Sequence, residues 1–349
     1  MRPSTSLAIT SAGAAIAPTR VDRRELRRDD VAVAVSHCGI CHTDLHAVRD
    51  GSGPYPLVPG HEFVGTVSAV GTDVERFAPG DAVAVGNIVD SCGVCAACRA
   101  EQQNWCHEFP TLTYAGTDRI DGSTTAGGWS TEYVVRDAFV YHRPEDLDPA
   151  AVAPLMCAGV TVWEPLRALG VGPGVRVGVA GLGGLGHLAV KLAAALGAEV
   201  TVLTTTAAKA EEGASLGAVD AVLTTDPDAV AAARASLDVV IDCIPVDHDL
   251  APYLGLLGTD GTLCVVGYLG STTVEVMSML GGRKRVTASG SAGRASTQEM
   301  LDFCGEHGIT ADVEVLPATE VGVALERLAR GDVRYRFVLD MAELAGLAG

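Results

Sequence analysis

The sequence predicts an α/β protein in which a β-rich first part precedes a doubly wound parallel sheet. In about the first 150 residues, short segments of alternating apolar and polar residues are separated by Gly, Pro and Asp, which is typical of barrel-like or sandwich-like domains. These expected strands lie at 30–38, 61–71, 80–86 and 130–142. Between about residues 170 and 290, apolar strand-like segments alternate with Ala-rich helical segments, which is the order of a parallel sheet covered by helices.

The elements of the second part are expected to follow one another without long gaps. Strands are predicted at 175–180, 199–206, 221–225, 238–244 and 261–268, and helices at 187–198 and 207–218. After residue 297 the pattern changes to a helix, a strand, a helix at 321–331 and a last strand at 334–341.

Composition excludes several classes of function. The chain has 349 residues, of which 48% are hydrophobic, so it can bury a large core. Its net charge of −18 repels phosphate backbones and argues against a nucleic-acid partner. No apolar run approaches the roughly 20 residues that span a bilayer, and the first ten residues do not resemble a signal peptide. Cysteines outside one cluster are scattered, so a reducing cytoplasm is the expected compartment.

The cysteine cluster lies in the segment DSCGVCAACRAEQQNWC, with the spacing C-x2-C-x2-C-x7-C, and consists of Cys92, Cys95, Cys98 and Cys106. Four thiolates at this spacing suit one tetrahedral metal ion, in a zinc or iron–sulfur site. Disulfides are the alternative, but the rest of the chain does not resemble a secreted scaffold. We therefore expect a structural zinc in this lobe.

A glycine-rich turn between a strand and a helix predicts a dinucleotide site. Gly181 allows the tight turn, Gly183 lets the backbone approach a pyrophosphate, and Gly186 lets helix and strand pack closely; Gly184 and Leu185 complete the G-x-G-x-x-G loop. The helix N-terminus then supplies N–H donors and the positive end of a dipole. The alternative is a glycine-rich turn with a structural role only.

The end of the second strand indicates which dinucleotide binds. An acidic residue there would bind the ribose 2′-hydroxyl of NAD, but the strand ends in Thr204, Thr205 and Thr206, with Lys209 three residues on and Glu199 at the opposite end. Hydroxyls and an ammonium group without a carboxylate suit a 2′-phosphate, which favours NADP(H). The alternative role for the threonines is to cap the next helix.

Three separate segments offer ligands for a second metal site. They are the segment 38–46, which contains Cys38 and Cys41, the pair His61-Glu62, and Cys157. Two thiolates and one imidazole with an open fourth position would fit a catalytic zinc. Spacing alone is weak support, because isolated Cys and His residues are commonly core fillers or surface groups.

Taken together, the motifs of the chain resemble those of a known family. GICHTDLH, PGHEFVG, the four-cysteine lobe, LMCAGVTVW, GLGGLGH and GDVRYRF together look like the zinc-dependent medium-chain alcohol dehydrogenases, and most like the cinnamyl-alcohol-dehydrogenase branch with its bacterial NADPH-dependent aldehyde reductases. The resemblance covers nearly the whole chain. It implies a GroES-like catalytic domain with the zinc lobe (1–155), a Rossmann NADP-binding domain (156–294), a C-terminal segment that returns to the catalytic domain (295–349), and a homodimer.

The resemblance also implies roles for single residues. Cys41, His61 and Cys157 would hold the catalytic zinc, Glu62 would lie behind the metal and join it transiently, and Asp44 would orient His61.

A proton path is implied as well. Thr43 would pass the proton, the coenzyme ribose and His46 would continue the relay, and His42 would face the coenzyme phosphates.

The implied reaction is zinc-dependent hydride transfer between NADP(H) and an aldehyde/primary alcohol pair, in which the metal polarises the carbonyl oxygen. Two alternatives remain: a sibling reductase of an activated C=C or C=N bond, and a non-catalytic protein that binds NADPH and zinc.

The substrate pocket is expected to draw on five residues, Tyr114, Trp163, Tyr268, Ser289 and Ser291. Relatives often have S-x-I-G-G where this chain has Ser289 to Gly293, so a small polar residue replaces a bulky apolar one. We expect a wider pocket that admits a larger or more polar aldehyde.

Overall fold

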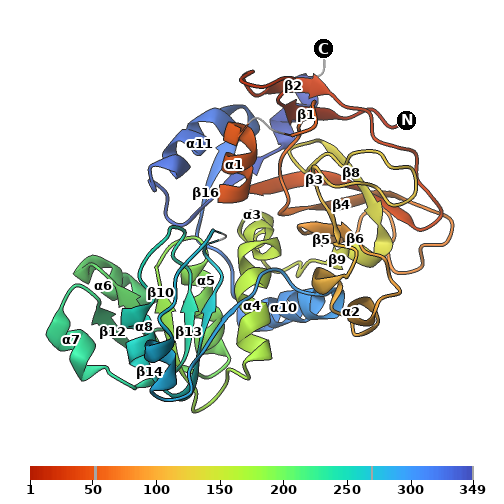
Figure 1. Cartoon of the computed structure of the whole chain (residues 1–349). Coiled ribbons are helices and arrows are strands. Elements are labelled where there is room, and N and C mark those ends of the chain that lie inside the picture. The colour runs from red at the N-terminus through yellow and green to blue at the C-terminus, as the bar shows by residue number, and fades with distance from the viewer. Residues whose placement is uncertain (51–52, 269, 348–349) are drawn as a thin grey trace. The chain divides into compact units, whose positions relative to one another are not determined.

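The computed structural model describes residues 1–50, 53–268 and 270–347, and Figure 1 shows the order of the elements along the chain. Contacts within the chain divide it into two compact units, Met1–Cys157 with Ala292–Gly349, and Ala158–Ser291. The chain therefore leaves the first unit after Cys157 and returns to it at Ala292. None of the described helices is long and apolar enough to cross a bilayer.

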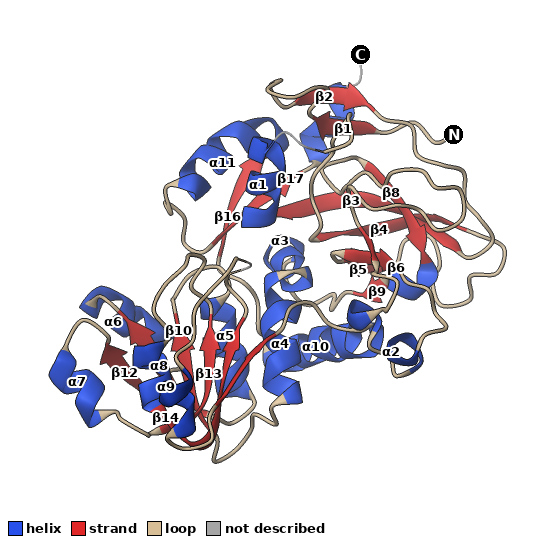
Figure 2. Cartoon of the chain, viewed as in Figure 1, coloured by secondary structure: helices blue, strands red, loops and turns tan. Residues whose placement is uncertain are grey.

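A seven-stranded sheet forms the centre of the first unit (Figure 2). Its strands are β3 (Asp30–Ile40), β4 (Phe63–Val70), β5 (Ala82–Val85), β8 (Glu132–Arg136), β9 (Tyr141–His142), β16 (Val313–Pro317) and β17 (Arg336–Asp340). The strand order is β16-β17-β3-β4-β5-β9, and β8 also pairs with β3. Because β17 pairs antiparallel with β3, segments from the two ends of the chain share this sheet.

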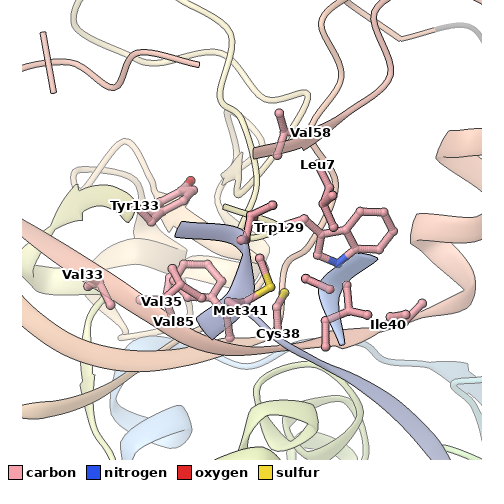
Figure 3. Packing of buried hydrophobic residues seen from close by; sticks show 14 of the residues in the cluster. Leu7, Val33, Val35, Cys38, Ile40, Val58, Val85, Trp129, Tyr133 and Met341 are labelled. Atoms are coloured by element: carbon pink, nitrogen blue, oxygen red, sulfur yellow. The ribbon is translucent and has the colours of Figure 1, made fainter. Parts of the chain in front are cut away.

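The core of the first unit lies against this sheet. Phe63, Trp129 and Phe337 are all fully buried in it. Figure 3 shows Trp129 beside Leu7, and the Cys38 thiol among apolar side chains of the same cluster. The alternating pattern predicted for 130–142 is confirmed in β8, where Tyr133 and Val135 are buried and their neighbours are partly exposed.

Shorter elements complete the first unit. Two small antiparallel pairs are β1 (Thr5–Ala8) with β2 (Ala17–Arg20), and β6 (Ile88–Asp90) with β7 (Thr111–Leu112). The α-helices are α1 (His42–Asp50), α2 (Ala96–Arg99), α3 (Pro149–Val152), α10 (Arg294–His307) and α11 (Val321–Ala329). The 3-10 helices are η1 (Gln103–Trp105), η2 (Asp137–Phe139), η3 (Ala153–Met156), η4 (Ala318–Glu320) and η5 (Ala342–Leu347). The two helices and the last strand predicted after residue 297 are confirmed by α10, α11 and β17.

The second unit is built on a six-stranded parallel sheet in the order β12-β11-β10-β13-β14-β15. Its strands are β10 (Arg176–Ala180), β11 (Glu199–Thr204), β12 (Asp220–Leu223), β13 (Leu237–Asp242), β14 (Leu257–Val265) and β15 (Arg285–Ala288). Its helices are α4 (Ala158–Ala168), α5 (Gly186–Ala195), α6 (Ala207–Ser215), α7 (Pro227–Ala232), α8 (Ala251–Leu256) and α9 (Val276–Leu280). This strand order is that of a doubly wound Rossmann sheet, so the predicted fold class is confirmed. The strand order reverses between β10 and β13: β11 and β12 extend the sheet on one side of β10, and β13, β14 and β15 extend it on the other. Such sheets bind dinucleotides at this point.

Candidate active site

Three side chains from separate segments of the first unit converge on one point. Cys41 lies between β3 and α1, His61 lies just before β4, and Cys157 lies directly after η3. The Cys157 and Cys41 sulfurs are 3.8 Å apart, and His61 Nε2 is 3.3 Å from the Cys157 sulfur. Two thiolates on one tetrahedral zinc, each at ~2.3 Å, would be about 3.8 Å apart. The spacing of the two sulfurs therefore fits such an ion.

Asp44 fixes the orientation of the imidazole. Its Oδ1 accepts hydrogen bonds from His61 Nδ1 at 3.1 Å and from Gly60 N at 3.0 Å, and its Oδ2 accepts one from Cys41 N at 2.8 Å. Burial alone would lower the pKa of His61, but the Asp44 carboxylate and the Cys41 sulfur together outweigh burial and raise it. Because Nδ1 carries the donated proton, Nε2 is left facing the two sulfurs, where a metal ion would replace its proton.

A hydrogen bond joins the two thiols of this set. The contact with Cys157 lowers the pKa of the Cys41 thiol well below its usual value, and the same contact raises the pKa of Cys157. One sulfur is thus prepared as a thiolate, which is the form that binds metal. Cys38, the other thiol of the same segment, is fully buried in the apolar core and is not part of this group (Figure 3).

A buried ion pair lies beside the ligand His61. Glu62 is fully buried, and its Oε1 contacts the guanidinium of Arg336 on β17, which is 5% exposed. Burial raises the pKa of Glu62 to about 8, and Arg336 opposes part of that rise. Gly39 leaves the space for this carboxylate, because a Cβ there would lie 2.6 Å from Glu62 Oε1. Arg336 was not among the residues predicted from the sequence, although it belongs to the GDVRYRF segment.

The first turn of α1 presents the polar groups expected of a proton path. His42, Thr43 and His46 are exposed, whereas Asp44 and Leu45 are buried. The Thr43 hydroxyl oxygen lies 3.8 Å from the Cys41 sulfur. A hydroxyl is therefore placed directly beside a candidate metal ligand.

The four-cysteine lobe forms a second thiol group. The sulfurs of Cys92, Cys95, Cys98 and Cys106 all lie within 4.8 Å of one another. Backbone N–H groups point at these sulfurs: Cys95 N donates to the Cys92 sulfur, and Cys98 N and His107 N donate to the Cys95 sulfur, at 3.4 to 3.5 Å. The donors on His107 and Cys98 lower the pKa of the Cys95 thiol to about 6. Burial raises the pKa of the Cys98 thiol to about 11, so the four thiols are not all prepared as thiolates before a metal binds. Four sulfurs this close together still make the ligand set of a structural zinc.

The glycine-rich turn of the second unit has the geometry that its sequence predicts. Gly181 has a φ of +84°, which a residue with a side chain rarely adopts. A Cβ on Gly186 would lie 2.0 Å from the Gly181 carbonyl oxygen, so α5 packs directly on the turn. Gly183 has open space around its Cα, as a site for an approaching pyrophosphate requires. Gly184 and Leu185 complete the turn before α5.

The carboxyl end of β11 is free of acidic residues. Thr204 is buried at the strand end, and Thr205, Thr206 and Lys209 are exposed just beyond it. Glu199 starts the same strand and is therefore at the far edge of the sheet. Thr206 also caps α6 by accepting a hydrogen bond from Lys209 N at 3.4 Å, so the alternative role proposed for the threonines is present as well.

The five residues expected in the substrate pocket differ in their surroundings. Tyr114 is buried with its ring 5.8 Å from that of His61. Trp163 is 1% exposed within the second unit, and Arg167 stacks over its ring. Tyr268 and Ser289 are partly exposed.

Ser291 is buried, with a left-handed φ of +61°. It is the last residue of the second unit before the chain returns to the first.

Two family profiles match the chain. Residues 27–145 match "Alcohol dehydrogenase GroES-like domain", and residues 184–306 match "Zinc-binding dehydrogenase". Together they extend over both units described above.

Curated and solved relatives match over nearly the full length. "Aldehyde reductase YahK" of Escherichia coli is 44% identical over 337 residues, covering 95% of this chain and 96% of the relative. A cinnamyl alcohol dehydrogenase structure from Sorghum bicolor is 42% identical with a TM-score of 0.93, covering 99% of this chain and 98% of that one. A cinnamyl alcohol dehydrogenase structure from Helicobacter pylori, a complex with NADP(H), is 34% identical with a TM-score of 0.89. The match covers 97% of this chain and 98% of that one.

Proposed function

Because the chain belongs to the zinc-dependent medium-chain alcohol dehydrogenases, in the cinnamyl-alcohol-dehydrogenase-like branch, we propose that it transfers hydride between NADP(H) and an aldehyde/primary alcohol pair. One observation carries this proposal: Cys41, His61 and Cys157 converge on one point, with the Thr43 hydroxyl beside them. The same hydroxyl is placed to protonate the alkoxide that hydride transfer to a carbonyl produces.

The residues that would hold the catalytic zinc are Cys41, His61 and Cys157. When bound, the metal supplies Lewis-acid polarisation of a carbonyl oxygen. Three protein ligands leave one position open for substrate. Asp44 keeps the imidazole in the tautomer that a metal needs, and Glu62 is the carboxylate placed next to the ligand for transient coordination.

The proton path starts at α1. Thr43 donates a proton to the substrate oxygen as negative charge develops on it, which is worth typically about 10²- to 10⁴-fold in rate. His46, one turn along the exposed side of the helix, passes the proton on towards solvent with the coenzyme ribose. His42 is exposed on the same turn.

The coenzyme is NADPH, bound across the carboxyl ends of β10 and β13 in the second unit. Thr204, Thr205, Thr206 and Lys209 receive its 2′-phosphate, and the H. pylori relative was solved with NADP(H). Lys209→Ala should raise the KM for NADPH and leave that for NADH unchanged, because only the former carries the 2′-phosphate. Equal catalytic efficiency of the wild type with both coenzymes would refute the assignment.

The substrate is an aldehyde larger or more polar than a simple cinnamyl-type compound, because Ser291 stands where relatives often have a bulky apolar residue. The decisive experiment is turnover of a panel of aldehydes, activated alkenes and imines with NADPH at matched concentrations. Reduction of aldehydes alone supports the proposal. Reduction of alkenes or imines alone supports the sibling reductase, and no turnover with retained NADPH binding supports the non-catalytic alternative.

The chain forms a homodimer in the cytoplasm. β15 is the edge strand of the parallel sheet, and its exposed main-chain groups can pair with the same strand of a second copy. Val276, Met277 and Leu280 on the adjoining α9 are 66 to 72% exposed, as an uncovered interface would be. All ten cysteines are free thiols, which suits a reducing compartment. Sedimentation analysis showing a monomer at micromolar concentration would refute the dimer.

A further inference from the structure

The four-cysteine lobe contacts the start of α10 through one buried amide. Gln103 is 3% exposed in η1, between the third and fourth cysteines of the lobe. Its Nε2 donates to the Cys98 carbonyl at 3.4 Å and to Glu101 Oε2 at 3.0 Å, and its Oε1 accepts from Arg294 N at 2.9 Å. The Gln103 side chain thus joins the backbone of Cys98, a candidate zinc ligand, to Arg294, the first residue of α10.

Helix α10 depends on this contact for its N-terminal cap. Its own N-cap residue is Gly293, which has no side chain to accept a hydrogen bond from the free N–H groups of the first turn. Gln103 Oε1 supplies that acceptor from outside the helix. The Glu101 carboxylate adds two hydrogen bonds of 3.1 Å from Arg294 Nη2.

The backbones of the two segments are also in direct contact. A Cβ built on Gly293 would lie 1.8 Å from the Glu101 carbonyl oxygen. Glu101 itself has a left-handed φ of +59°, which turns the lobe backbone against the helix start. The position of Gly293 is therefore set by the lobe.

The segment fixed in this way is the one expected to bound the substrate. The chain returns to the first unit between Ser291 and Ala292, just before Gly293. On the other side of this crossing, the Ser289 hydroxyl donates to Glu164 on α4, within the second unit. Each end of the segment is therefore fixed within its own unit.

We propose that Gln103 and Glu101 are positioning residues for the substrate-binding segment 289–293, so that the lobe has a role in aldehyde recognition besides its role in stability. The inference rests on the proposed function, because it takes the substrate of that reaction to be an aldehyde bound beside this segment. The lobe sets the first-unit end of the segment through Gly293 and Arg294. Removing the amide contact loosens the pocket wall without touching a metal ligand or the coenzyme site.

Position 294 offers a matched pair of variants that isolates the hydrogen bond. Arg294→Ala removes the guanidinium and keeps the N–H that Gln103 accepts. Arg294→Pro removes the guanidinium and that N–H, and proline is well tolerated at the first position of a helix. Gly293, with ψ of 169°, has the extended conformation that a residue before proline prefers. Gln103→Met, which keeps the size of the side chain and removes its polar atoms, is combined with each variant.

The first readout is steady-state kinetics with NADPH and two aldehydes, acetaldehyde and cinnamaldehyde. Gln103→Met in the Arg294→Ala background should raise KM for the bulky aldehyde by about five- to tenfold, as loss of one buried hydrogen bond allows. In the Arg294→Pro background, Gln103→Met should raise KM for the bulky aldehyde by less than about twofold, because the hydrogen bond to Gln103 is already absent. Zinc content and the KM for NADPH should not change. If the ratio of the KM values for the two aldehydes is unchanged and only the melting temperature falls, the proposal is overturned.

The second readout does not need activity. Hydrogen–deuterium exchange of a peptide that contains residues 289–294 should become at least about fivefold faster in Gln103→Met, with zinc retained. If the wild type reduces no aldehyde, the proposed function fails, and this measurement still decides whether Gln103 holds the segment. Unchanged exchange in the zinc-loaded variant would overturn the positioning role by itself.

Discussion

Replacing Arg336 by Met should lower the stability of the first unit by more than the loss of an exposed ion pair would. The guanidinium contacts Glu62, and both residues are almost completely removed from water. Above about pH 8, where Glu62 is ionised, Arg336→Met leaves its carboxylate buried without a counter-charge, and breaking a buried pair in this way costs about 3–5 kcal/mol. Pairs at the surface contribute at most about 1 kcal/mol.

A double-mutant cycle tests whether the cost comes from the pair. Glu62→Met in the Arg336→Met background removes the orphaned carboxylate, so the double variant should recover much of the stability lost in the single one. The free energy of unfolding is measured above about pH 8 in guanidinium chloride by tryptophan fluorescence, at equal zinc occupancy. Activity is not the readout, because Glu62 adjoins the ligand His61. A loss below about 1 kcal/mol in Arg336→Met, or strictly additive single effects, would show that the pair is not what stabilises this region.

Further predictions concern the metals, the proton path and acid stability. Cys92→Ser should lower the melting temperature and the zinc content, whereas Cys41→Ser should mainly abolish turnover; elemental analysis and calorimetry distinguish them, and equal losses of stability would contradict the two roles. Thr43→Val should lower kcat at least about tenfold at neutral pH while Thr43→Ser, which keeps the hydroxyl, should not; full activity of Thr43→Val would refute the relay. Burial raises the pKa of Asp118, but the hydrogen bonds from Arg27 and from the backbone N–H groups of Ile120 and Asp121 together outweigh this and bring it to about 2. The pair therefore stabilises the fold above about pH 4 and stops doing so as the pH falls towards 2. Asp118→Asn should lower the free energy of unfolding by about 1 kcal/mol at pH 7 and by progressively less in acid, as measured by urea midpoints. A difference between the two proteins that does not change with pH would contradict this.

Much of the fold could be predicted from local patterns in the sequence. The alternation of strands and Ala-rich helices between 175 and 268 predicted the parallel sheet, because buried parallel strands and their covering helices have distinct periodicities. The hairpin of β1 and β2 was not predicted. β2 has only four residues, contains Pro18 and is largely exposed, so it lacks the alternation of a half-buried strand.

The candidate site was predicted in part. Its sulfur and imidazole groups stand in recognisable motifs, whereas the partner of Glu62 could not be found by any local pattern. Arg336 lies 274 residues away along the chain and comes close only because β17 pairs with β3. Gln103 is a similar case, since its contact with Arg294 spans 191 residues. Contacts of this kind depend on the sheet topology and on how a loop packs, which periodicity does not determine.

The three candidate zinc ligands share one structural property that explains how residues so far apart can be positioned accurately. Each lies at a junction between elements and not inside one. Inside a helix or strand, the backbone N–H groups are used by the element itself, whereas at a junction they remain available to side chains. Asp44 uses two such groups, on Cys41 and Gly60, and holds His61 with the same carboxylate. One buried carboxylate thereby fixes two of the three ligand segments before any metal binds, and a site ordered in advance gives up less entropy on binding its ion.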